Sequence, residues 1–327
     1  MSKITAKGIW QILRNAGKGF MKDKVPKLSA SLAYYTIFSL GPMLIVIIFL
    51  TNLFWGQQAV EGNIVGQLKD LIGNKAALQI QTIIKNASID SNNKLTAIVG
   101  FITLLIGATT VFSEIQDSIN SIWNLKVKAE RGWLKMLITR LLSFSIVVAL
   151  GFLLLVSLVV NALLEGLMDQ LQQLFPDIAV IIIYILNLLL TLLVIGFLFA
   201  IIYKVLPDAV IQWRDVSVGA LFTTVLFMIA KFGITFYIGK SDIGSTYGAA
   251  GSLVILLLWI YFSSMILYFG AEFTKAYAMK YGSEIKPNEY TVTVQVVQVE
   301  SKDSVQKNEE TAAETQKKAQ EAKDSSK

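Results

Sequence analysis

Long uncharged stretches alternate with short charged segments along this chain. The longest at its C-terminal side, residues 243–271, contains no charged side chain. An α-helix rises about 1.5 Å per residue, so about 20 apolar residues cross the hydrocarbon core of a bilayer. Surface helices of a soluble bundle need a polar face, which these stretches lack. The pattern therefore predicts membrane-spanning helices.

Five such stretches, and a sixth that is interrupted only by Lys231, predict an all-α membrane protein built on a bundle of six transmembrane helices. The composition agrees, since 54% of the residues are hydrophobic and 16% are charged. We expect a cytoplasmic, amphipathic N-terminal segment at 1–27 and a six-span transmembrane domain at 28–282. The expected spans cover residues 33–55, 95–113, 141–164, 178–203, 216–239 and 248–273.

Lysine and arginine gather on one side of the expected spans. Seven lie within the first 32 residues, against one acid, and others follow the second, fourth and sixth spans. The segments after the third and fifth spans are nearly free of them. Because basic loops stay in the cytoplasm, we expect both termini there. The four lysines of segment 61–94 argue weakly against this orientation.

Several segments outside the spans have the periodicity of amphipathic helices. In segment 4–20, Ile12 and Ala16 share a face with other apolar residues. This helix either lies on anionic lipid headgroups or packs on the bundle. Segment 61–90 predicts two more helices on the outer face. Segment 114–123 predicts a third amphipathic helix, whose apolar face contains Ile115, Ile119, Ile122 and Trp123.

The chain changes character at Ser283. Residues 283–327 contain 16 charged side chains in 45, against 36 in the preceding 282. This composition predicts a disordered cytoplasmic tail. The run "TVTVQVVQV" (291–299) alternates like a strand, but without a second strand it is expected to be a linker.

Charged and polar residues within the spans are candidate ligand-binding residues, because burying them in a membrane is costly. Lys231 lies eight residues before Gly239, about 12 Å below the outer surface at about 1.5 Å per residue. Asn187 lies at nearly the same depth. Lys231 and Asn187 together predict a polar binding point for an anionic headgroup. The alternative is that the Lys231 side chain extends to the membrane surface.

Glu272 follows the last uncharged stretch and is expected close to the cytoplasmic surface. At that depth it can approach Arg214, Asp215 and Glu114, which also lie at span ends. We expect an ion pair between Glu272 and Arg214 that acts as a cytoplasmic latch; a proton-coupling carboxylate is the alternative. Asp215 also suits the N-cap of the fifth span.

Gly41 and Pro42 predict a kink in the first span, because proline removes a backbone donor and clashes with the preceding turn. Small residues at the start of the last span predict close helix packing, namely Gly248, Gly251 and Ser252.

Five motifs resemble the YihY/BrkB family of bacterial inner-membrane proteins, once mislabelled as a ribonuclease family. They are "SLAYYTIFSLGPMLIVII" (31–48), "NSIWN" (120–124), "LPDAVIQWRDVSVGAL" (206–221), "AKFGITFYI" (230–238) and "YGAAGSLVILLLWIYFSSMILYFGAEFT" (247–274). The resemblance implies a six-span inner-membrane protein with roles in envelope lipid traffic or in resistance to host killing. It brings no catalytic residue.

The absent residue types exclude several kinds of chemistry. The chain has no cysteine and no histidine, which removes thiolate sites and the commonest general base. A two-metal nuclease needs clustered carboxylates, and here the acids are scattered. The net charge of +6 is explained by topology and by attraction to anionic lipid. We expect neither an enzyme nor a metal, cofactor or nucleic-acid partner.

Two functions remain. The first is a transporter or flippase-like carrier of a lipid or other anionic amphiphile, with membrane lipids as its partners. The alternative is a non-transporting envelope scaffold, which recruits a protein partner through its tail and outer loop. The sequence leaves the substrate, the energy source and the oligomeric state open.

Overall fold

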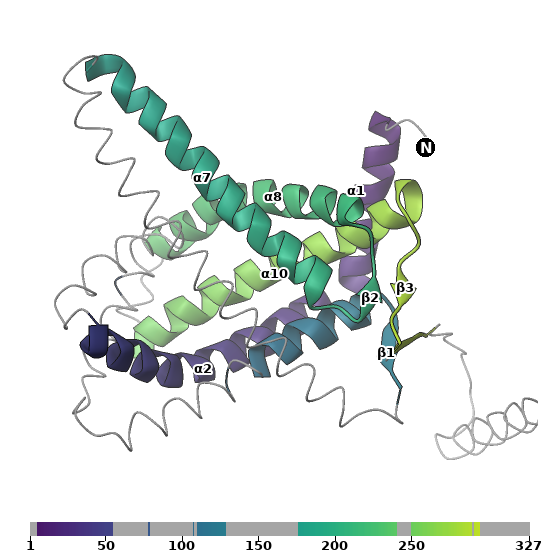
Figure 1. The fold of residues 1–327 in the computed structure, drawn as a ribbon, viewed down its shortest axis with the longest axis horizontal. Coiled ribbons are helices and arrows are strands. Elements are labelled where there is room, and N and C mark those ends of the chain that lie inside the picture. The colour runs from purple at the N-terminus through teal and green to yellow at the C-terminus, as the bar shows by residue number, and fades with distance from the viewer. Residues whose placement is uncertain are drawn as a thin grey trace, which may run out of the picture. The chain divides into compact units, whose positions relative to one another are not determined.

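The computed structural model describes residues 5–54, 78, 107, 110–128, 176–240, 250–289 and 291–294. Within these ranges the long helices are α1 (Ala6–Lys22), α2 (Val25–Phe54), α7 (Pro176–Val205), α8 (Trp213–Lys240) and α10 (Gly251–Tyr281) (Figure 1). Residues 110–122 are also helical. The short strands are β1 (Leu125–Val127), β2 (Ala209–Val210), β3 (Lys286–Pro287) and β4 (Thr291–Thr293).

Three of these helices are long and apolar enough to cross a membrane. The spanning stretches are Leu188–Val205 in α7, Trp213–Ile238 in α8 and Leu253–Tyr281 in α10. They match three of the expected spans, and α2 covers most of a fourth. The expected spans at 95–113 (for the most part) and 141–164 lie outside the described residues, as do the outer-face helices of 61–90. The number of six spans therefore stays a prediction.

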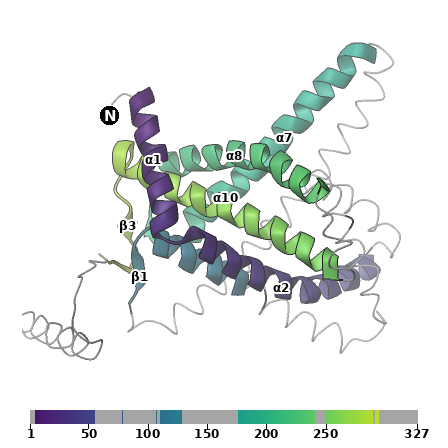
Figure 2. The same ribbon diagram turned by 180° about the vertical axis from the view of Figure 1, so that it is seen from behind.

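Helix α10 packs against three other helices and organises the described part of the chain. It contacts α2 and α8 along its length and α1 near its C-terminal end (Figures 1 and 2). Helix α7 packs on α8. The core between them contains the fully buried Tyr203 and Tyr268, together with Ile119 and Ile122 of the helix at 110–122. The buried face expected for segment 114–123 is therefore confirmed.

Helices α8 and α10 cross through two near-identical pentapeptides, GALFT (219–223) and GAEFT (270–274). A Cβ atom at Gly219 would overlap the side chain of Thr274, and one at Gly270 would overlap Thr223. Each threonine hydroxyl donates to the carbonyl of the glycine in its own pentapeptide, at 2.7 Å. The hydroxyls are thereby satisfied, and the two backbones can approach closely.

The small residues expected to pack at the start of the last span are covered in part. Gly251 is buried at the start of α10, whereas Gly248 and the side chain of Ser252 lie outside the described residues. Helix α2 continues through Gly41 and Pro42, whose side chains are also outside the described part. The kink there stays a prediction.

Helix α1 packs on the bundle, as one of the two placements expected for it requires; contact of its exposed face with lipid headgroups stays a prediction. Thr5 caps its start by accepting a hydrogen bond from the Gly8 N–H at 3.2 Å. Ile12 and Ala16 are buried against Phe273 and Tyr277 of α10. Trp10, on another face of α1, remains 69% exposed.

The segment after α10 belongs to the folded domain, which shifts the tail boundary that we expected at Ser283. Strand β3 pairs with β2, and β4 pairs with β1, both antiparallel. The compact unit extends to Thr293. The run starting at Thr291 thus has a partner strand in this chain. That strand, β1, follows directly after the NSIWN motif and has three residues, too few to be recognised from sequence.

Candidate functional site

The first and the last described helices cross where Gly19 of α1 faces Glu272 of α10. A Cβ atom at Gly19 would overlap the Glu272 carboxylate, whereas a Cβ at Gly17 would meet no described atom within 4 Å. Glycine at position 19 therefore makes room for the carboxylate. The helices run antiparallel here, because Gly8 at the other end of α1 lies against Tyr281.

The Glu272 side chain is buried, with 3% of its surface exposed. Its Oε1 atom has no hydrogen-bond partner among the described residues. The charged groups that act on this carboxylate are Asp23, Lys275 and Lys22. A buried polar atom normally finds a partner, since leaving it unpaired costs free energy. Glu272 Oε1 is thus a site where a donor from a ligand would be stabilised.

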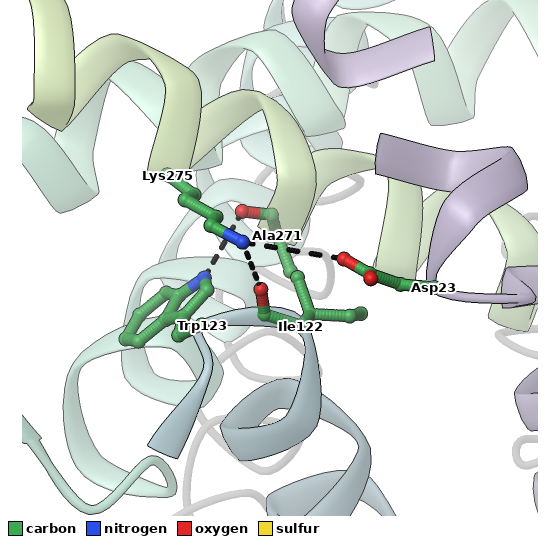
Figure 3. A network of polar contacts seen from close by, with 5 residues as sticks. All are labelled: Asp23, Ile122, Trp123, Ala271 and Lys275. Carbon is green, nitrogen blue, oxygen red and sulfur yellow. Dashed lines mark hydrogen bonds and ion pairs between the residues drawn. The ribbon is translucent and has the colours of Figure 1, made fainter. Parts of the chain in front are cut away.

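Lys275, one turn after Glu272, ties three segments together (Figure 3). Its Nζ atom lies 4.0 Å from Asp23 Oδ2, in the turn between α1 and α2, and donates a hydrogen bond to the carbonyl of Ile122. Next to it, the Trp123 indole N–H donates to the Ala271 carbonyl at 3.1 Å. This network fixes the position of α10 relative to the α1–α2 turn and to the NSIWN motif.

A cavity of about 600 Å³ opens at this crossing. Its charged lining consists of four lysines and two carboxylates: Lys18, Lys22, Lys275, Lys280, Asp23 and Glu272. Lys280 donates to the Gly8 carbonyl at 3.2 Å and to the Gln11 side chain. The excess of lysine makes the cavity attractive to an anion.

Two of the lysines remain available for a ligand. Lys18 and Lys22 lie four residues apart on α1, so their side chains point in nearly the same direction. Both are exposed, and neither ammonium group has a hydrogen-bond or ion-pair partner within the described ranges. Lys275 and Lys280 already bond to protein groups.

The cavity lies at the level where the membrane surface is expected. Helix α10 has 31 residues, about 46 Å at about 1.5 Å per residue, whereas the hydrocarbon core is about 30 Å thick. About 20 residues counted from Leu253 reach Glu272, so the last turns of α10 extend into the headgroup layer.

A second polar cluster lies at the corner formed by the NSIWN and LPDA motifs. Asn120 and Asp208 form two hydrogen bonds with each other. The Asp208 carbonyl accepts from the Thr291 hydroxyl at 2.8 Å, and its carboxylate accepts from Asn288 Nδ2 at 3.3 Å. All partners are protein groups, so this cluster holds the segment after α10 in place.

The residues expected to form a cytoplasmic latch lie in separate places. Glu272 is next to Asp23 and Lys275 and not next to Arg214, which is exposed in the first turn of α8. Asp215 follows it in that turn and is buried, but it is not an N-cap: its Oδ2 accepts from the Ser283 N–H and hydroxyl at 2.9 and 2.8 Å. Glu114 lies near Tyr268 of α10.

The candidate ligand pair of the outer half is described in part. Lys231 is partly buried in α8. Asn187 belongs to α7, but its side chain lies outside the described residues. Their contact therefore stays a prediction.

The sequence reasoning missed Gly19, Asp23 and the lysines of the cavity as site residues. It used the basic N-terminal segment for topology and for attraction to lipid headgroups, and not for a binding site. One signal could have located the crossing: Gly8, Ala16 and Gly19 lie close to one face of α1 and permit a close helix approach.

Comparison with known proteins relates the chain to membrane proteins of bacteria. A UPF0761 membrane protein of Tolumonas auensis is 28% identical over 265 residues, 77% of this chain and 80% of that protein. One of Haemophilus influenzae is 25% identical over 272 residues, 80% of this chain and 94% of its own. One of Ralstonia nicotianae is 28% identical over 262 residues, which span 56% of that longer protein. No solved structure matches.

The family described as virulence factor BrkB matches residues 16–292. This range includes all charged lining residues of the cavity, the strands β1, β2 and β3, and β4 except for its last residue. The resemblance expected from the five motifs is thus confirmed over most of the chain. The chain belongs to the virulence factor BrkB family of membrane proteins.

Proposed function

We propose that the protein binds an anionic amphiphile, in the first place a membrane lipid, with its headgroup in the cavity between α1 and α10, and carries it within the inner membrane. One observation supports this proposal above the others. The cavity brings four lysines together where apolar α10 leaves the hydrocarbon core. A lipid phosphate at that level would meet Lys18 and Lys22, each contributing about 1 kcal/mol of attraction.

Exposed apolar side chains beside the cavity would suit the rest of such a ligand. Met21 is 73% exposed and Met279 is 75% exposed, and each is next in sequence to a lysine of the lining. Methionine adapts its shape to irregular apolar partners. An acyl chain leaving the cavity could therefore pack on these residues.

Carrying a lipid also requires contacts on the opposite side of the membrane. Lys231 follows Trp213 by 18 residues in α8, about 27 Å along the helix axis. It would hold the headgroup there together with Asn187, and the kink at Gly41 and Pro42 would shape the path between the two places. In this arrangement both chain termini are cytoplasmic.

The alternative function, a scaffold for an envelope protein, is favoured by a different observation. The strands β3 and β4 hold the chain up to Thr293 on the domain. The charged segment that follows therefore leaves from a fixed place, which suits recruitment of a partner. A scaffold would not depend on Lys18, Lys22 or Lys231.

Native mass spectrometry of the purified protein with its co-purifying lipids tests the proposal. We expect Lys18→Gln/Lys22→Gln to weaken lipid binding by about thirtyfold, because two contacts of about 1 kcal/mol each are lost. The matched control is Lys7→Gln/Lys27→Gln, which removes the same charge from α1 and α2 at exposed positions outside the cavity. Lys231→Met tests the second contact.

Equal lipid binding by the wild-type protein and the cavity variant would contradict the carrier function and would favour the scaffold. If the control variant lost as much lipid as the cavity variant, general surface charge and not this cavity would attract the lipid.

A further inference from the structure

The charges of the cavity between α1 and α10 are separated into an inner and an outer part. The inner part contains the buried Glu272 and Asp23, the latter 4.0 Å from Lys275. The outer part contains the exposed Lys18 and Lys22. The inner part thus has two acids for one fixed base, and the outer part has two bases that form no ion pair within the described ranges.

This separation is poorly matched to a simple anion. An anion at the lysines leaves the carboxylates of Glu272 and Asp23 as they are, with Glu272 Oε1 unpaired among the described residues. Two neighbouring carboxylates repel each other, and at a partly desolvated site this repulsion is stronger than in water. A cation placed against Glu272 would lower that energy and supply the missing hydrogen-bond donor.

We propose that the ligand of this cavity is zwitterionic: a lipid headgroup with a phosphate held by Lys18 and Lys22 and a primary ammonium group held by Glu272. This inference rests on the proposed function: it keeps the anionic phosphate as the group that the lysines bind and adds an ammonium group to the same headgroup. A primary ammonium has three N–H donors, so it can bond Glu272 Oε1 and Asp23 together. A quaternary ammonium has no N–H and cannot.

Helices α1 and α10 place the groups that would bind phosphate and ammonium around the same crossing. On α1, Lys18 and Lys22 flank Gly19, whose missing side chain lets Glu272 reach the space between the helices. Lys275 and Lys280 are held by Ile122, Gly8 and Gln11. These two lysines therefore shape the site, and the charged groups of the ligand are bound by Lys18, Lys22 and Glu272.

A headgroup series on the wild-type protein tests the inference without any variant. Native mass spectrometry would compare phosphatidylethanolamine, phosphatidylcholine and phosphatidylglycerol with identical acyl chains. Phosphatidylethanolamine can donate a hydrogen bond to the Glu272 carboxylate, and phosphatidylcholine cannot. We therefore expect phosphatidylethanolamine to bind about tenfold tighter than phosphatidylcholine. Glu272→Gln should abolish this difference, and Lys18→Gln/Lys22→Gln should weaken all three lipids.

The possible outcomes separate this inference from the proposed function. If the wild-type protein bound phosphatidylglycerol most tightly, the ammonium site would be overturned, and the binding site for an anionic lipid would be retained. The Glu272 and Asp23 carboxylates would then share a proton. If the wild-type protein bound all three lipids no more tightly than the Lys18→Gln/Lys22→Gln variant does, both the ammonium site and the proposed function would be overturned. Soluble phosphoethanolamine serves as a competitor: displacement at the same concentration as the lipid would overturn the lipid as the ligand.

Discussion

Asn120 and Asp208 hold each other through two reciprocal hydrogen bonds. The Asn120 amide donates to Asp208 Oδ2 at 2.8 Å, and the Asp208 backbone N–H donates to Asn120 Oδ1 at 2.9 Å. Both side chains are buried. The Asp208 main chain also accepts from Thr291. This one pair therefore connects the NSIWN motif, the end of α7 and the strand that follows α10.

Replacing Asn120 by leucine should destabilise the domain, because the Asp208 carboxylate would lose its shorter hydrogen bond and the Asp208 backbone N–H would lose its acceptor. Leaving such a group unpaired costs about 1–3 kcal/mol. A thermal-unfolding experiment in detergent should show a clear drop in midpoint temperature. Ser121→Ala is the control, since its side chain is exposed. Equal midpoints for the two variants would show that the pair contributes nothing to stability.

Gly19→Ala and Gly17→Ala should have opposite effects although both lie in α1. The first places a methyl group on the Glu272 carboxylate, and the second places it in open space. Overpacking should cost about 1–3 kcal/mol at position 19, whereas alanine at 17 should gain up to about 1 kcal/mol of helix propensity. Unfolding midpoints of both variants measure this. The combination Gly19→Ala/Glu272→Ala should recover part of the loss, and strict additivity would contradict the contact.

The crossing of α8 and α10 should tolerate no added methyl group at Gly219. Its Cβ would overlap the Thr274 side chain, whereas Gly233 of the same helix has nothing within 4 Å among the described residues. We expect Gly219→Ala to lose about 1–3 kcal/mol and Gly233→Ala to lose nothing. Adding Thr274→Ala to the first variant should recover part of the loss, because it removes the hydroxyl and Cγ2 atoms that the new methyl group overlaps but keeps the Cβ atom. Strict additivity of the two substitutions would contradict the contact.

Two truncations should distinguish the folded boundary from the one expected from composition. Ending the chain after residue 282 removes the Ser283 donors to Asp215 together with β3 and β4. Ending it after residue 294 keeps them. We expect the shorter chain to unfold at a lower temperature and the longer one to match the full-length protein. Identical midpoints for the two truncations would return the boundary to Ser283.

Single cysteines should report the orientation of the spans, because the chain contains no cysteine of its own. Lys7→Cys and Lys240→Cys place the probe on exposed positions at opposite ends of the described helices. With both termini in the cytoplasm, a membrane-impermeant thiol reagent applied from outside should label Lys240→Cys and spare Lys7→Cys. The reverse pattern would invert the topology.

Much of the fold could be predicted from sequence because it depends on local patterns. The apolar lengths of α7, α8 and α10 and the periodicity of α1 each follow from residues close together in the chain. The five motifs likewise indicated the family. These features need no knowledge of distant contacts.

The site could not be predicted in the same way, because its contacts join residues far apart in the chain. Glu272 could approach several charged groups by depth, and sequence alone does not say that the turn containing Asp23 lies nearer than Arg214. Strand β1 has three residues, fewer than a periodic pattern needs. The reciprocal glycine and threonine contacts of α8 and α10 depend on the helix register, which the pentapeptides do not reveal.

The crossing of α1 and α10 also has a consequence for the biogenesis of the protein. Gly19 and Glu272 are about 250 residues apart, so the ribosome needs roughly 13–50 s to synthesise the second after the first, at about 5–20 residues per second. Throughout this time α1 exists without the surface that covers Ile12 and Ala16. During this time the membrane surface or a chaperone must protect the apolar face of this helix from premature contacts. The cavity is therefore complete only when insertion of the last helix ends, and a chain that stalls before α10 has no site.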